Sequence, residues 1–229
     1  IEEQEKMTPE LLGKIQAAET MSELEDIYLP YKPKRRTRAT IAREKGLEPL
    51  AEIIFKQEET DPSQKAEEFL NENVRSVEEA LAGAGDIIAE WINEDENARK
   101  NLRYIFDREA VIYSKVVRGK ETEGIKFSDY YEWSEPLKKC PSHRLLAMRR
   151  GEDEGFLKLS IEPDEEHALE VLNTLFIKGR NESSVLVEEA VKDSWKRLLS
   201  ASMETEFRNI SKEKADDEAI NVFADNLRQ

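Results

Sequence analysis

The amino-acid sequence predicts a mainly α-helical protein, an irregular array of many helices with a helix-turn-helix-like unit and at most one or two short strands. Ala, Leu, Glu and Lys, which favour helices, are abundant, whereas the 229 residues include only 9 Gly, 8 Pro and 7% aromatic residues. Apolar residues recur three and four positions apart through most of the chain, as on the buried face of a helix. Ser, Thr or Asp often precedes such a segment, in the position that caps a helix.

The first 60 residues contain the start and stop signals of four short helices. Thr8 caps the first of them, and a proline follows it in the first helical position. A capping box of Ser22 and Glu25 begins the second. Two prolines then end this helix, because proline lacks the backbone N–H and restricts the residue before it. We therefore expect the tract from Tyr31 to Arg36 to be extended and exposed.

Residues 32–45, called the basic tract below, differ in charge from the rest of the chain. They hold seven cations and one anion, a charge of +6, whereas the whole chain carries −15. Because the remainder must then be strongly acidic, long-range repulsion should keep nucleic acid from coating the whole surface, and any contact must be local. The candidate nucleic-acid-binding residues are Lys32, Lys34, Arg35, Arg36, Arg38, Arg43 and Lys45.

The third and fourth predicted helices resemble a helix-turn-helix. One runs from Thr37 to Gly46 and the other begins near Leu47, so that a glycine joins them. Pro49 lies early in the helix that would read bases, and the cations precede the first helix or lie on it. These features favour a plain helical hairpin over a reader of the major groove.

The next segment, residues 61–125, is also predicted to be helical. An Asp-Pro pair caps a first helix at position 61, and a capping box of Ser76 and Glu79 begins a longer one. Gly83 and Gly85 lie inside this longer helix, where glycine is unfavourable. We expect them to allow another helix to approach closely.

Strand signals are few. Apolar spacing after Asp95 predicts a helix to about Val117, although the β-branched residues in AVIYSKVV favour a strand over 110–117. Alternating apolar and polar residues from Phe156 to Ile161 form the best strand candidate, but the sequence identifies no partner strand for it.

The last segment, residues 126–229, begins with an aromatic, turn-rich stretch. Further helices are predicted from near Ser142, Asp164, Ser184 and Ser211. We divide the chain into residues 1–60, 61–125 and 126–229, and expect one continuous helical region of a longer protein.

The sequence contains no strong catalytic, cofactor or metal motif. Cys140 and His143 have no further Cys or His nearby to complete a zinc site, and Ser142 beside His143 lacks a nucleophile-elbow motif. GAGDII lacks the complete glycine pattern of a dinucleotide site, and RGKETEG is best explained as a turn. We expect no enzyme, no cofactor and no metal, and we interpret the acidic runs as solvated faces.

A cytoplasmic location is expected. No apolar run approaches the roughly 18 residues that a membrane-spanning helix needs, and no signal peptide opens the chain. The single cysteine, Cys140, excludes an intrachain disulfide and fits a reducing compartment.

Four blocks run in order over nearly the whole chain: YLPYKPKRRTRATIAREKGLEPLA, RGKETEGIKFSDYYEW, CPSHRLLAMRRGEDEGFLKLSI and SWKRLLSASMETEFR. Together they closely resemble the N-terminal helical region of the Tex family, bacterial transcription accessory proteins. The resemblance implies a longer protein with an RNase H-like domain, helix-hairpin-helix elements and an S1-type OB-fold RNA-binding domain. It also implies a role in transcription and sequence-independent association of the full-length protein with RNA or DNA.

Two functions for the basic tract remain open. In the first, its cations neutralise phosphates and Tyr28 and Tyr31 stack on bases; in the second, the tract docks onto protein. In the second case the partner would be a neighbouring domain, RNA polymerase, or acidic patches of the same chain at 152–154 and 164–166. Paired guanidinium groups would favour docking, and exposed cations without a carboxylate partner would favour nucleic acid.

Overall fold

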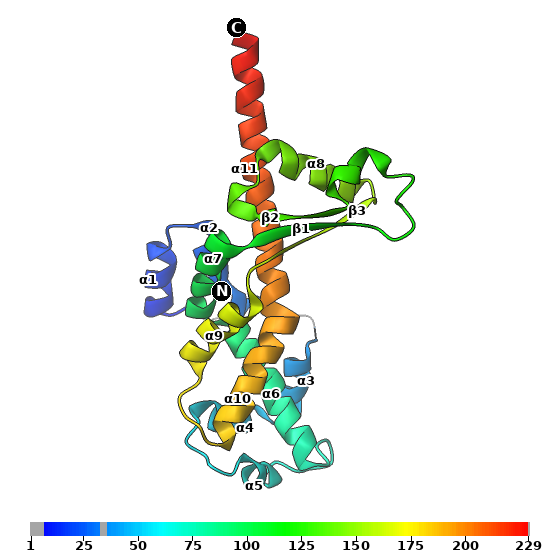
Figure 1. Cartoon of the computed structure of the whole chain (residues 1–229). Coiled ribbons are helices and arrows are strands. Elements are labelled where there is room, and N and C mark those ends of the chain that lie inside the picture. Colours follow the sequence, from blue (N-terminus) through cyan, green and yellow to red (C-terminus); the bar gives the residue numbers. More distant parts are fainter. Residues whose placement is uncertain (1–6, 33–35, 229) are drawn as a thin grey trace. The chain divides into compact units, whose positions relative to one another are not determined.

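The computed structural model describes residues 7–32 and 36–228, which form two compact units (Figure 1). Unit 1 comprises residues 1–101 and 169–199, and unit 2 comprises residues 102–168 and 200–229. Helices dominate the described residues, which confirms the predicted mainly α class. None of the helices in these residues is long and apolar enough to cross a membrane.

Unit 1 is built from helices. Its elements are α1 (Pro9–Ala17), α2 (Met21–Tyr28), the 3-10 turn η2 (Leu29–Tyr31), α3 (Arg38–Glu44), α4 (Glu48–Lys56), α5 (Pro62–Glu67), α6 (Val77–Glu94), the first part of α7 (Glu96–Glu109), most of α9 (Glu165–Phe176), α10 (Glu182–Ser194) and a π-helical turn (Trp195–Leu199).

Most helix starts follow from local sequence. A side-chain oxygen accepts a hydrogen bond from the backbone N–H three residues later, which satisfies one of the free donors at the helix start. The caps predicted at Thr8, Asp61, Ser76, Asp95 and Asp164 are confirmed. The cap predicted at Ser22 is wrong, because Thr20 caps α2 and Glu23 accepts the backbone N–H of Glu19.

Helix α6 is the centre of unit 1, where it contacts α3, α4, α5 and α10. Its buried apolar residues include Ala84, Ile87 and Ile88, all completely inaccessible to solvent. A Cβ at Gly83 would lie 2.5 Å from Leu47 Cδ1, so the predicted close approach is confirmed at Gly83. The same prediction is wrong for Gly85, because a Cβ there would meet nothing within 4 Å.

An ion pair attaches α2 to the start of α7 within unit 1. Arg99 Nε donates to Asp26 Oδ1 at 2.5 Å, and both side chains are less than 10% exposed. A buried pair of this kind holds two elements in one arrangement, since separating it would leave a charge without its partner.

Unit 2 contains a small antiparallel sheet with the order β2-β1-β3. Its elements are the last part of α7, β1 (Val111–Val116), η3 (Ile125–Tyr130), β2 (Glu132–Pro136), η4 (Leu137–Lys139), α8 (Ser142–Asp153), β3 (Leu157–Glu162), the start of α9 and α11 (Ser200–Arg228). Ile112 pairs with Ile161 and Ser114 with Leu159, and these four residues form part of the buried face. Both α8 and α11 pack on β3.

The sheet corrects several expectations. Helix α7 ends at Glu109, and the stretch predicted to continue it to Val117 is the central strand β1. Its β-branched and aromatic residues pack well in a sheet once strands flank both sides, which outweighs the helical spacing. Strand β3 confirms the candidate at 156–161, and β1 is its missing partner. With β2 the sheet has three strands, one more than the expected maximum.

Helix α11 is longer than predicted, because it runs unbroken from Ser200 to Arg228 and no new helix begins at Ser211. Ser211 instead bonds back to the carbonyl of Phe207 at 2.6 Å, as Ser and Thr do inside helices.

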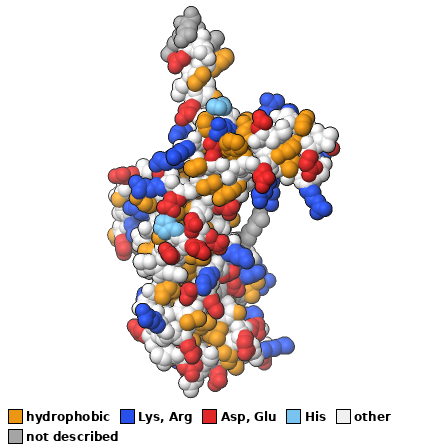
Figure 2. Space-filling model, in the orientation of Figure 1, with side chains coloured by type: hydrophobic (Ala, Val, Ile, Leu, Met, Phe, Trp, Pro, Cys, Tyr) orange, Lys and Arg blue, Asp and Glu red, His pale blue; other side chains and the backbone are white. Residues whose placement is uncertain are grey.

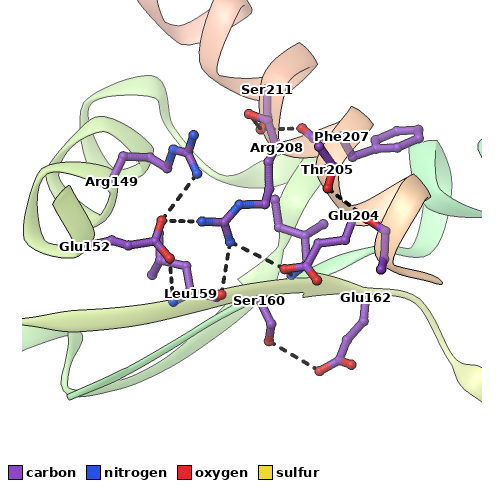
Figure 3. Close-up of polar contacts among 12 residues, drawn as sticks. Arg149, Glu152, Leu159, Ser160, Glu162, Glu204, Thr205, Phe207, Arg208 and Ser211 are labelled. Atoms are coloured by element: carbon purple, nitrogen blue, oxygen red, sulfur yellow. Dashed lines mark hydrogen bonds and ion pairs between the residues drawn. The ribbon is translucent and has the colours of Figure 1, made fainter. Parts of the chain in front are cut away.

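Side chains of α8 and α11 satisfy the outer edge of β3 (Figure 3). The backbone N–H of Leu159 donates to Glu152 Oε1 at 3.2 Å, and that of Ile161 donates to Glu204 Oε1 at 3.3 Å. Arg208 Nη1 donates to the carbonyl of Leu159 at 3.0 Å and its other terminal nitrogen pairs with Glu152. The edge is therefore closed to pairing with another strand.

Candidate nucleic-acid interface

The helical part of the basic tract is fixed to α6. Ala39 and Ala42 form the buried face of α3, and their small side chains allow the helix to lie close to α6. Thr37 caps α3 by accepting the backbone N–H of Thr40 at 3.0 Å. The Thr37 hydroxyl also donates to Glu90 Oε2 at 3.0 Å, which connects the helix start to α6.

The turn after α3 has the geometry that its glycine predicts. Gly46 adopts a φ of 80°, a conformation that favours glycine, and its backbone N–H donates to the carbonyl of Arg43 at 2.9 Å. The backbone N–H of Leu47 donates to the carbonyl of Ala42, and α4 begins at Glu48. The predicted helix-glycine-helix arrangement is therefore present, while its use as a helix-turn-helix stays a prediction.

Arg43 is the most firmly held of the cations that the structure describes in the tract. Its Nη1 lies 2.6 Å from Glu90 Oε1, and its Nε lies 3.0 Å from Glu48 Oε1. Burial alone would lower the pKa of Arg43, but the hydrogen bonds to Glu90 and Glu48 outweigh that effect and raise it. The Glu90 side chain is only 8% exposed, so Arg43 contributes charge that neutralises a buried carboxylate.

Lys45 pairs with the capping-box residue of α6. Its Nζ lies 2.5 Å from Glu79 Oε1, while Glu79 Oε2 accepts the backbone N–H of Arg75 at 3.0 Å. The hydrogen bond from Lys45, followed by that from the backbone N–H of Arg75, lowers the pKa of the Glu79 carboxyl. Glu79 thus caps α6 and holds the end of α3 at the same time.

The remaining described cations of the tract are exposed. Arg36 pairs with Glu44 at 2.8 Å, but both side chains are more than half exposed, so solvent screens the pair. The side chains of Lys32 and Arg38 have no hydrogen bond or ion pair to any other described residue. Arg38 acts at longer range on Asp86. Burial raises the pKa of the Asp86 carboxyl, and the charges of Arg197 and Arg38 oppose this shift without cancelling it. Lys34 and Arg35 lie outside the described residues.

The two tyrosines proposed to stack on bases differ in setting. Tyr28 is 39% exposed and lines an apolar hollow in unit 1 with Ile15 and Leu24. Packing between α1 and α2 accounts for its position. Tyr31 ends η2 and is partly exposed.

The acidic patches expected to pair with the basic tract have other partners. Glu152 pairs with Arg149 and Arg208, and Glu154 pairs with Lys126 and Arg150. Asp164 caps α9. Glu152 and Glu154 are thus neutralised by cations closer in the fold, and pairing of these patches with the basic tract stays a prediction. Figure 2 shows acidic and basic side chains interspersed over the visible face, with no large area of one sign.

The residues that the sequence offered for hydrolase or zinc chemistry lie in different settings. Ser142 donates to Glu218 on α11, and His143 is exposed. Burial, followed by a hydrogen bond with Glu135, raises the pKa of Cys140 to about 12. Within residues 7–32 and 36–228, no group of three or more His, Cys, Asp or Glu side chains is placed to hold a metal ion.

Comparisons with known proteins found a matching family model and several similar proteins. The family model described as Tex central region-like matches residues 57–223. The whole chain is 42% identical to the "Transcriptional accessory protein Tex" of Neisseria gonorrhoeae and 40% identical to "Protein tex" of Bordetella pertussis, and covers 31% of each. It is 26% identical to the human "S1 RNA-binding domain-containing protein 1", of which it covers 24%. The chain thus spans about a third of the length of its bacterial relatives.

Proposed function

The chain belongs to the Tex family, and on that premise we propose that it is a non-catalytic helical scaffold within a cytoplasmic, nucleic-acid-associated transcription accessory protein. The names of its relatives refer to transcription and to an S1 RNA-binding domain, which supports association of the longer protein with nucleic acid. In this proposal the basic tract has two parts with different functions. One part holds the scaffold together, and the other contacts phosphate.

The ion pair of Arg43 with Glu90 is the observation that carries the proposal. A cation that neutralises a buried carboxylate cannot leave for a phosphate without exposing that carboxylate to an unfavourable environment. The same reasoning applies, more weakly, to Lys45 with Glu79. Arg43 and Lys45, two of the seven candidate residues, are therefore assigned to the scaffold.

Phosphate contact is assigned to the part of the tract that precedes and begins α3. Lys32 and Arg38 have no described carboxylate partner, and the exposed pair of Arg36 can exchange for a phosphate at little cost. These cations lie before the helix or in its first turn, so they suit contact with a backbone better than reading of base edges. We therefore propose binding that is independent of sequence.

A salt titration tests this assignment on the 229-residue chain. The probes are a fluorescein-labelled 20-nucleotide single-stranded RNA and a DNA duplex of the same length. The variant K32A/R36A/R38A should reduce the slope of log K against log salt by about 2 to 3, because each lost contact removes about 0.7 to 0.9. The control K56A/K100A/K196A removes the same charge from exposed positions of unit 1 and should leave most of the slope unchanged.

The alternative is a docking module that binds protein and has no nucleic-acid affinity of its own. The carboxylate pairing of Arg36, Arg43 and Lys45 favours it, since guanidinium and ammonium groups engaged in this way serve protein contacts. Neighbouring domains and RNA polymerase are the proposed partners. Equal slopes for the variant and the control would support this alternative and reject phosphate contact.

The proposed lack of catalysis has a separate test. The chain is incubated with end-labelled RNA or DNA in the presence of magnesium, and the products are separated by length. We expect intact substrate after prolonged incubation. Cleavage that increases with purified chain and is abolished by a metal chelator would contradict the proposal.

A further inference from the structure

Gly85 lies in the interior of α6 without a packing reason. Glycine is, after proline, the least favourable residue in a helix interior, so an interior glycine usually serves close packing. Gly83, two residues earlier, does so against Leu47. A Cβ at Gly85 would meet nothing within 4 Å, and the space beside this residue is open.

That space is part of a groove within unit 1. A hollow of about 330 Å³ lies between α6 and α10, with Ile54 of α4 among its lining residues. Each helix contributes residues from one face, at positions 78, 81, 82, 85 and 86 of α6 and at 186, 189, 190 and 193 of α10. Such spacing runs along the helix for about two turns, so the groove is elongated in the direction of the two helices.

The groove combines apolar surface with carboxylates. Leu81, Ala82, Leu186 and Ala190 provide apolar lining on the two helices, and Ala82 is exposed to solvent. Glu78, Asp86, Glu189 and Asp193 provide carboxyl groups along the same two faces. A ligand with apolar groups in its centre and cations at its side would match this arrangement.

The negative charge is not neutralised along the whole groove. Arg197 pairs with Asp193 at 2.6 Å and lies 3.5 Å from Asp86. Glu78 and Glu189 are exposed and have no ion pair to any residue in the described part of the chain. A backbone N–H, followed by the hydroxyl of Ser76, lowers the pKa of the Glu78 carboxyl. The two glutamates thus lie on opposite helices as anions that no described cation neutralises in an ion pair.

We propose that this groove docks a basic amphipathic helix of a partner protein, with a large apolar side chain over Gly85 and Lys or Arg facing Glu78 and Glu189. An amphipathic helix laid in a groove between two helices presents apolar residues at the same three- and four-residue spacing as the groove. Charge complementarity selects a basic partner, because the same carboxylates repel phosphate and acidic segments. Arg38, which is assigned to phosphate contact, acts electrostatically on the lining residue Asp86. The docking proposal does not depend on that assignment.

Binding of a designed peptide tests the proposal. The probe is a fluorescein-labelled 16-residue helical peptide with Leu on one face and Lys on the other, and its scrambled isomer has the same charge without the apolar face. We expect the amphipathic peptide to bind the 229-residue chain at least tenfold more tightly than the scrambled isomer. Equal affinities, or no binding up to 1 mM peptide, would overturn the proposal.

Two variants identify the groove as the site. Gly85→Leu extends into the open space and should weaken binding at least tenfold without lowering the melting temperature, because Leu favours the helix and its Cβ meets no atom within 4 Å. Gly13→Leu is the matched control, since Gly13 also lies in a helix, with nothing within 4 Å of its Cβ and no part in the groove. It should leave binding unchanged.

A second pair of variants tests the charges. E78Q/E189Q should weaken binding at least fivefold and flatten its salt dependence. E182Q/E188Q removes the same charge from positions of α10 that do not line the groove, and should change binding less than twofold. Unchanged binding by both Gly85→Leu and E78Q/E189Q, or equal losses in each variant and its control, would reject the groove as the docking site.

Discussion

Arg43 on α3 and Glu90 on α6 form an ion pair of 2.6 Å across 47 residues of sequence. Glu90 is 6% exposed, and its second oxygen accepts the hydroxyl of Thr37. The basic tract therefore contributes a cation to the interior of unit 1 as well as cations to its surface. A segment that differs in charge from the rest of the chain need not be a binding site throughout.

Arg43→Ala should destabilise unit 1. Removal of Arg43 takes a charged hydrogen-bond donor from a buried carboxylate, so we expect a loss of about 2 kcal/mol in the free energy of unfolding. Chemical denaturation monitored by tryptophan fluorescence measures it. The control is Arg36→Ala, which breaks an exposed pair and should cost less than about 0.5 kcal/mol. Equal losses for the two variants would contradict a structural function of Arg43.

Local sequence predicted the elements better than their contacts. The caps at Thr8 and Ser76 and the glycine turn at Gly46 depend on atoms within four residues, so the sequence contains all the information needed to predict them. Strand β1 could not be predicted from neighbouring residues alone. It is a strand because β2 and β3 lie on both sides of it, and β3 is more than 40 residues away in the chain.

The carboxylates that hold the basic tract were missed for the same reason. Glu79 and Glu90 lie 34 and 47 residues from Lys45 and Arg43. Glu79 was recognised as a capping residue, but its second function depends on where α3 packs. Glu90 carried one usable signal, since it is a charged residue beside the apolar positions Ile87 and Trp91 of α6. A carboxylate in that position requires a cation, and Arg43 of the basic tract supplies one.

Acid should remove the contribution of Glu79 to stability. Because its pKa is lowered in the folded chain, the folded state favours the charged carboxylate more than the unfolded chain does. This contribution is full above the unfolded pKa and is lost as the pH falls through the folded one. Glu79→Gln should therefore lower the melting temperature at pH 7, and its difference from the unaltered chain should shrink below about pH 4. Lys45→Ala should show the same trend, and a difference that stays constant down to pH 3 would contradict it.

The Cys140 thiol should react slowly. With its pKa raised to about 12 by burial and by Glu135, the thiolate fraction at pH 8 is about a thousandfold below that of an ordinary cysteine. Reaction with a thiol-specific chromogenic reagent should be slower in the folded chain by about that factor than in concentrated urea. Glu135→Gln removes the nearby charge and should accelerate the reaction, whereas Glu132→Gln, at an exposed position of the same strand, should not. Fast modification of the folded chain would show that the thiol is neither buried nor suppressed.

Arg208 should protect the outer edge of β3. It donates to the carbonyl of Leu159 and pairs with Glu152 and Glu204, the carboxylates that accept the backbone N–H groups of Leu159 and Ile161 (Figure 3). Arg208→Ala should destabilise unit 2 by about 2 kcal/mol, because the arginine connects several charged hydrogen bonds.

Hydrogen exchange distinguishes this function from a general loss of stability. In Arg208→Ala the amides of Leu159 and Ile161 should exchange faster than those of β1, and the exposed edge should promote self-association at high concentration. Lys158→Ala is the control, because it changes an exposed side chain on the same strand without touching the edge contacts. If all amides of the sheet accelerate equally in Arg208→Ala, the arginine stabilises unit 2 as a whole and has no particular function at the edge.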